Sequence, residues 1–166
     1  MKTLSEDSAP AMPKPVAIKA ADAAPRKAPI AYPVSFHAQI GNRIKRPLGD
    51  LFGLKNFGVN ITTLAPGARS ALQHNHSRQD EFIFILAGEA VLVTGEVETV
   101  LGPGMCAGFP AGDASHHLEN RGYAPVDYLE MGDRTEGDAV DYPHDDLVAT
   151  MKDGQRIFHR KDGTAY

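Results

Sequence analysis

Apolar and polar residues alternate in short runs between residues 57 and 133, as they do in β-strands that bury one face. β-Branched and aromatic residues fill these runs, and glycine-containing turns interrupt them at intervals of roughly 8–12 residues. No long run of apolar positions with helical spacing lies between them. The pattern therefore predicts an all-β sandwich or barrel with very little helix.

The two ends of the chain have a different character. Residues 1–30 are dominated by alanine, proline and lysine without any period, so we expect a flexible N-terminal extension. Residues 31–166 are long enough to form a single domain with its own core. Within that domain, the acidic residues 137–166 are expected to form a covering segment with one further hairpin.

Charge and hydropathy exclude several classes of partner. The formal net charge of −4 argues against nucleic acid, because surfaces that bind phosphate backbones are basic. No run approaches the roughly 18 apolar residues of a membrane span, so no membrane partner is expected. The N-terminus also lacks the apolar region of a secretory signal, and we expect a cytoplasmic location.

The only cysteine, Cys106, excludes an internal disulfide and a cysteine-rich zinc module. Its neighbours in the sequence, Met105 and Ala107, are apolar. The local pattern therefore predicts a thiol that is buried in the core rather than a nucleophile.

Candidate chemistry lies in the stretch LQHNHSRQDEFIFILAG. Residues i and i+2 of a strand share a face, so His74 and His76 place two imidazoles side by side. Neutral imidazole is a common ligand of divalent transition metals. Glu81 has the wrong parity for an uninterrupted strand, but a bend at the polar residues SRQD would return it to the same side. A carboxylate that leads an inward apolar face is costly to bury unless a cation holds it.

A second pair of histidines stands in the stretch FPAGDASHHLEN, about forty residues later. Hairpin topology can bring this strand beside the first, and side chains from several strands meet inside a narrow barrel. A lone His-X-His is a weak indication of a metal site, because the same sequence can occur in a polar turn that precedes a strand. The carboxylate and the second histidine strand together favour a metal site.

These residues resemble the two sequence motifs of the cupin superfamily. The first motif is a glycine, a spacer, His-X-His, Glu and Gly, and it fits Gly67, His74, His76, Glu81 and Gly88. The second motif fits Gly104, Pro110, Gly112, His116 and Asn120, although three residues rather than two separate Gly112 from His116. His117 is the adjacent competitor. Because His116 shares a strand face with Leu118 and Asn120, we favour His116.

The resemblance implies a cupin-type double-stranded β-helix, which is a jelly-roll β-barrel. It also implies that one divalent metal ion (Zn, Fe, Mn, Ni or Cu) is held by His74, His76, Glu81 and His116. Open edges of such a barrel invite pairing, so we expect a homodimer that forms through sheet edges or an N-terminal strand.

The wider chain is similar to small single-domain bacterial cupins that are often named sugar-phosphate or mannose-6-phosphate isomerases. The resemblance implies a metal-dependent enzyme that acts on a small polar substrate, with sugar-phosphate isomerisation as the first interpretation. A metal-dependent Fe(II) dioxygenase and a non-catalytic module that binds a small molecule remain alternatives, since one fold hosts many functions. The predicted strands contain no evident Lys/Arg cradle for a phosphate group, which counts against the isomerase.

Overall fold

The computed structural model describes residues 14–27, 31–152 and 155–166. Its helices are short: η1 (Ala20–Asp22), η2 (Val34–Phe36), α1 (His37–Ile40) and α2 (Leu48–Phe52). The strands are β1 (Arg43–Pro47), β2 (Phe57–Leu64), β3 (Asn75–His76), β4 (Glu81–Ala87), β5 (Ala90–Thr94), β6 (Val97–Leu101), β7 (Cys106–Phe109), β8 (His116–Glu119), β9 (Val126–Asp133), β10 (Ala139–Tyr142), β11 (Leu147–Lys152) and β12 (Gln155–His159). No helix in these ranges has the length and hydropathy to cross a membrane.

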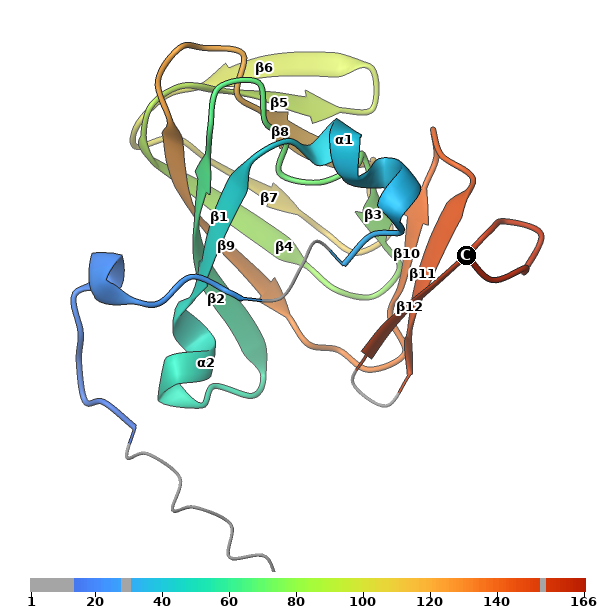
Figure 1. Ribbon diagram of the computed structural model, residues 1–166, viewed down its shortest axis with the longest axis horizontal. Coiled ribbons are helices and arrows are strands. Elements are labelled where there is room, and N and C mark those ends of the chain that lie inside the picture. Colours follow the sequence, from blue (N-terminus) through green and yellow to red (C-terminus); the bar gives the residue numbers. More distant parts are fainter. Residues whose placement is uncertain (1–13, 28–30, 153–154) are drawn as a thin grey trace, which may run out of the picture.

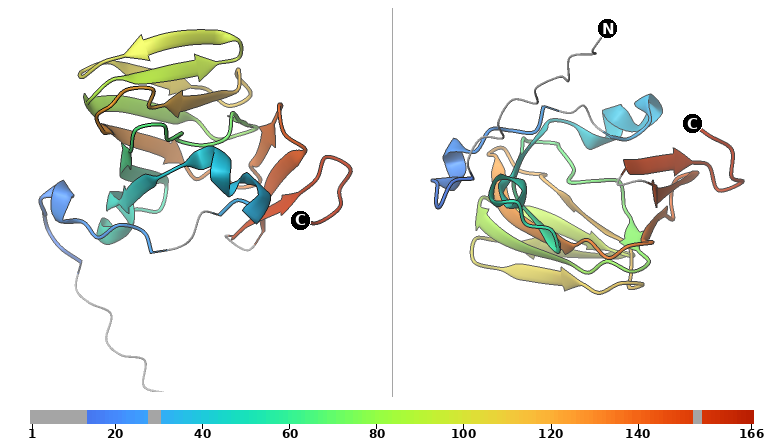
Figure 2. Two further views of the ribbon diagram at one scale, coloured as in Figure 1. Left: turned by 45° about the horizontal axis from the view of Figure 1, so that its top comes forward. Right: turned by 90° about the horizontal axis from the view of Figure 1, so that it is seen from below.

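Two antiparallel sheets form the body of the molecule (Figure 1). The larger has the strand order β1-β2-β9-β4-β7, and the smaller has the order β6-β5-β8. Figure 2 shows the yellow-green strands β5 and β6 as a layer that lies against the larger sheet. The prediction of an all-β jelly-roll fold is therefore confirmed.

The main core lies between these two sheets. Alternate residues of β4 and β9 point into it, and Ile85, Val126 and Tyr128 are almost completely buried. Leu92 of β5 and Leu118 of β8 belong to the same apolar cluster from the opposite sheet. The alternation of the sequence thus reflects one buried face on each sheet.

A third sheet, with the order β12-β11-β10-β3, stands beside the barrel (Figure 1). Residues of η2 and α1 pack against it in a second apolar cluster, in which Tyr32, Phe36 and Ile40 join Tyr142 and Leu147. The covering segment therefore contributes three strands rather than a single hairpin. Its first strand, β10, pairs with the two-residue strand β3 and so reaches the histidine motif.

The predicted N-terminal extension over residues 1–30 falls partly outside the described residues, which omit 1–13 and 28–30. Residues 14–27 contain only the short turn η1. The backbone N–H of Arg26 donates a hydrogen bond to the carbonyl oxygen of Lys45 at 2.8 Å, so this segment runs along the free edge of β1. The boundary between extension and domain near residue 30 stays a prediction.

The face of the larger sheet that points away from the core is also apolar, and we call it the outer face. The strand register aligns Ile61, Leu129, Phe84 and Cys106 in one row across β2, β9, β4 and β7. Cys106 is exposed, so the prediction of a buried thiol is wrong. Because Phe109 points into the core and alternate residues share a face, Cys106 has to point outward.

Gly88 makes the turn between β4 and β5 with a φ of 78°, a conformation that other residues adopt at a cost. A Cβ atom at this position would lie 2.5 Å from the carbonyl oxygen of Pro125. Glycine is therefore required at this position for two reasons: the positive φ angle, and the close approach of the chain just before β9.

Candidate metal centre

His74 and His116 lie directly opposite each other although 42 positions separate them in the sequence. They form an antiparallel bridge between the segment before β3 and the start of β8. The N–H of His116 donates to the carbonyl oxygen of His74 at 2.8 Å, and the reverse bond measures 3.2 Å. Side chains of such a pair point to the same side of the sheet, and the two ring centroids lie 5.0 Å apart.

His76 and Glu81 reach the same place from β3 and from the start of β4. His76 and Glu81 are five positions apart and would point to opposite faces of an uninterrupted strand, but the chain bends between β3 and β4, so both side chains reach the cluster. Asp138 holds this bend, because its Oδ1 accepts the backbone N–H of Arg78 at 2.9 Å and that of Gln79 at 3.3 Å. The bend predicted at SRQD is therefore present, and it is stabilised from a distant part of the chain.

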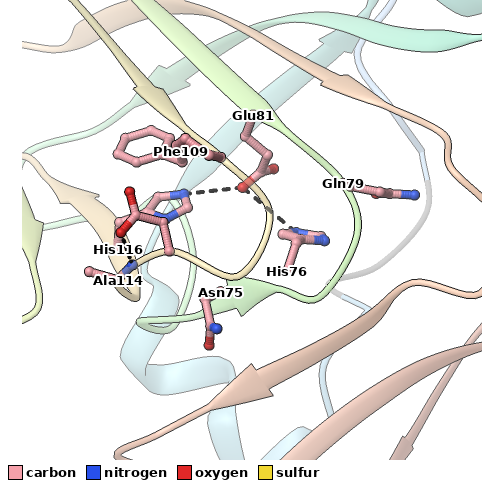
Figure 3. Close-up of a pocket in the computed structure, with 9 residues that line it drawn as sticks. Asn75, His76, Gln79, Glu81, Phe109, Ala114 and His116 are labelled. Carbon is pink, nitrogen blue, oxygen red and sulfur yellow. Dashed lines mark hydrogen bonds and ion pairs between the residues drawn. The ribbon is translucent and has the colours of Figure 1, made fainter.

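The three imidazoles converge on a single oxygen atom, Oε2 of Glu81. Figure 3 shows two of them, those of His76 and His116, on either side of the Glu81 carboxylate. Its distances to the Nε2 atoms are 3.5 Å for His74, 3.6 Å for His76 and 3.1 Å for His116. Two ligands that each lie about 2.1 Å from one metal ion, at angles of about 90–110°, are about 3.0–3.4 Å apart. The donor atoms of His74, His76 and Glu81 all lie within 4.8 Å of one another, and His116 joins them through its 3.1 Å contact with Glu81. The spacing and chemistry of these atoms suit the ligands of one divalent ion.

The outer nitrogens of two rings are held by hydrogen bonds. Nδ1 of His76 lies 2.6 Å from Oδ2 of Asp138, and Nδ1 of His74 lies 2.9 Å from the carbonyl oxygen of Leu72. Both partners accept, so each Nδ1 carries a proton and each Nε2 is directed at the cluster. His116 is oriented differently, by a parallel stack on the ring of Phe109 with centroids 3.5 Å apart.

Glu81 is ionised in this environment. Burial by itself raises the pKa of its carboxyl group, but hydrogen bonds with His116 and His74 and the charges of His74 and His76 act more strongly in the opposite direction. The pKa of Glu81 is consequently held well below its usual range. A charged carboxylate among three imidazoles is a donor set that suits transition metals.

His117, the alternative ligand, lies on the other side of β8. Its Nε2 is 2.9 Å from Oε1 of Glu119, and its ring is buried away from the cluster. Glu119 is also paired with Arg69 and Arg121. The structure thus places His116, rather than His117, beside His74, His76 and Glu81.

A cavity of about 1020 Å³ adjoins the cluster. The four residues of the cluster line one part of it, and a set of polar and charged side chains lines another part: Arg26, Arg43, Lys45, Asn60, Glu130 and Arg156. The volume is suitable for a small organic ligand next to the cluster.

Glu130 is the centre of a hydrogen-bonded group in this cavity. Its carboxylate accepts hydrogen bonds from Nδ2 of Asn60 at 3.0 Å and from the hydroxyl of Tyr128 at 3.1 Å, and it forms an ion pair with Lys45. Burial and the negative charge of Glu130 raise the pKa of Tyr128 well above its usual value, so the phenol stays protonated and donates. This group could not be recognised from the sequence because its members lie on three strands, β1, β2 and β9.

The fold and the site together define a β-barrel protein with a converging histidine–carboxylate cluster, and comparisons with known proteins identify its family. A family model described as a cupin domain matches residues 60–132. A sugar phosphate isomerase of the cupin superfamily from Silicibacter pomeroyi is 39% identical, covering 82% of this chain and 88% of its own, with a TM-score of 0.78. The chain therefore belongs to the cupin superfamily.

Two further solved structures are similar. A proposed sugar phosphate isomerase from Acidithiobacillus ferrooxidans is 27% identical, covering 75% of this chain and 80% of its own, with a TM-score of 0.69. A polyketide cyclase from Streptomyces resistomycificus, at 17% identity and a TM-score of 0.56 over 70% of this chain and 78% of its own, shares the fold alone. No curated protein matches the sequence.

Proposed function

We propose that this protein is a divalent-metal-dependent enzyme that acts on a small polar substrate, and that its reaction is the isomerisation of a sugar phosphate. The observation that carries the proposal is the convergence of three imidazole Nε2 atoms on Oε2 of Glu81, within 3.1–3.6 Å, beside a ligand-sized cavity. The similarity to proteins named as sugar phosphate isomerases supports the choice of substrate.

His74, His76, Glu81 and His116 would hold the ion, and Zn, Fe, Mn, Ni and Cu are all compatible with this ligand set. When bound, a divalent metal supplies polarisation of carbonyl and hydroxyl oxygens. The carboxylate of Asp138 keeps His76 in the tautomer that leaves Nε2 free for the ion.

Isomerisation of an aldose to a ketose moves a proton between neighbouring carbons, so the site needs a base that is not a metal ligand. Glu130 fits this role because it lines the cavity. It is paired with the buried residue Ile83 of β4, so its side chain points to the inner side of the larger sheet. Its carboxylate is fixed in place by the ion pair with Lys45 and by hydrogen bonds from Asn60 and Tyr128.

The test is a panel of aldose and ketose phosphates with the metal-loaded protein. We expect interconversion of at least one pair, loss of turnover with a chelator, and a fall in kcat of roughly 10²–10⁴-fold in Glu130→Gln. Glu96→Gln, at the exposed turn after β5, is the matched control. Failure of every sugar phosphate to react with each candidate metal would exclude the isomerase, whereas stabilisation by a ligand without turnover would favour a binding module.

We also propose a homodimer, formed by the outer face rather than by the sheet edges. Phe82, Leu86 and Met105 each remain 37–45% exposed on or beside this face. Together with the row from Ile61 to Cys106 they form an apolar surface, and exposed apolar patches often mark protein–protein contact sites. A second copy offers the same surface, so a two-fold axis would bury both at once.

A further inference from the structure

The wall of the cavity that β1 provides is cationic. Arg43 and Lys45 are two positions apart in β1 and therefore share a face. Their partners in β2 are Leu64 and Thr62, both completely buried, so this face of β1 points inward. Both basic side chains line the cavity, as does that of Arg26, whose backbone is bonded to Lys45.

Arg43 is partly buried, whereas Arg26 is exposed, and Arg43 has no anionic partner among the described residues. Lys45 is paired with Glu130, whereas Arg43 has neither an ion pair nor a side-chain hydrogen bond to any of the described residues. A guanidinium on an inward strand face is costly without an anion, although the cavity gives it partial access to water. Five Lys or Arg side chains and four carboxylates line this cavity in a chain whose formal net charge is −4.

We propose that Arg43 binds the phosphate group of the substrate, with the histidine cluster acting at the other end of the molecule. Arg43 can donate two parallel hydrogen bonds to a phosphate, whereas Lys45 stays paired with Glu130 and adds positive charge to the same wall of the cavity. This assignment rests on the proposed function for the nature of the substrate. It identifies a phosphate-binding element that the sequence pattern had not revealed.

The experiment uses the full chain after treatment with a chelator, so that no metal contributes, and titrates it with inorganic phosphate by calorimetry at low ionic strength. We expect millimolar binding that weakens at least tenfold in Arg43→Met and is unchanged in Arg78→Met, a control whose side chain is exposed outside the cavity. Sodium acetate, titrated in parallel, should bind more weakly, because a carboxylate carries less charge than phosphate. Arg43→Gln keeps a polar side chain and serves if the Met variant fails to fold.

Absence of phosphate binding by the wild type, or equal binding by Arg43→Met, Arg43→Gln and the wild type, would overturn the inference. Tighter binding of acetate than of phosphate would do so as well. Metal content is measured on the same preparations before chelation. Loss of phosphate binding with intact metal content therefore contradicts only this inference, and absence of metal with intact phosphate binding contradicts only the proposed function.

Discussion

Nδ1 of His76 and Oδ2 of Asp138 are 2.6 Å apart, and both side chains are buried although 62 positions separate them in the sequence. Through the same carboxyl group Asp138 fixes the bend that leads to Glu81. One residue from the covering segment therefore orients a candidate ligand and positions a second one.

This relationship predicts the effect of Asp138→Asn. The amide is neutral and a weaker acceptor, so His76 loses its preferred orientation and basicity, and metal affinity should fall roughly 10–100-fold. Competition with a chromophoric chelator measures the affinity. Asp141→Asn, at an exposed position of the strand β10 that follows Asp138, should bind the metal as tightly as the wild type. Unchanged affinity in Asp138→Asn would show that this contact has no part in metal binding.

The two adjacent histidines of β8 should respond differently to substitution. His116→Ala removes a nitrogen from the cluster and should abolish stoichiometric metal binding. His117→Ala removes the hydrogen bond to Glu119 and should cost about 1–2 kcal/mol of the free energy of unfolding while it leaves metal content unchanged. Metal analysis and urea denaturation of both variants provide the comparison. Retention of metal by His116→Ala together with its loss in His117→Ala would reverse the assignment.

The outer face predicts the oligomeric state. Phe82→Glu places a charge in the centre of the apolar surface, where burial against a second copy would be prohibitive. Sedimentation analysis should find a dimer for the wild type and a monomer for this variant. Val97→Glu, which is 65% exposed on β6 and lies outside this face, should remain a dimer. A monomeric wild type at tens of micromolar would refute the proposal.

Gly88 and Gly95 provide a matched test of the fold. Both have positive φ, but a Cβ on Gly95 would meet no atom within 4 Å, whereas on Gly88 it would collide with Pro125. Gly95→Ala should therefore cost about 1 kcal/mol of backbone strain alone. Gly88→Ala adds the collision and should cost more than about 2 kcal/mol, as measured by denaturant unfolding. Equal costs for the two variants would contradict the described packing.

The strands and the proximity of His74, His76 and Glu81 were predictable from local spacing. Alternation defines a strand within a few residues, and the polar residues SRQD indicate the bend that turns Glu81 to the side of His76, although Asp138 stabilises that bend. The choice between His116 and His117 followed from the same parity rule, because Leu118 shares the face of His116. The prediction for Cys106 was wrong because its neighbours on both sides are apolar, so the sequence does not show which face of this strand is buried.

The remainder of the site depends on contacts between distant segments. Asp138 lies in an acidic stretch 62 positions after His76, and no sequence motif links the two residues. Arg43 and Lys45 stand in NRIKRP, where basic residues on both faces obscure the alternation. Only the pairing of β1 with β2, and of β2 with β9, turns these cations toward the cavity and Glu130.

The central claim is that His74, His76, Glu81 and His116 hold one divalent metal ion. Elemental analysis of the wild-type protein after growth with supplemented metals tests it most directly, with His76→Ala and the exposed-site variant His144→Ala prepared in parallel. The account predicts about one ion per chain for the wild type and for His144→Ala, and almost none for His76→Ala. A wild type without stoichiometric metal, or a His76→Ala variant that keeps its ion, would contradict it.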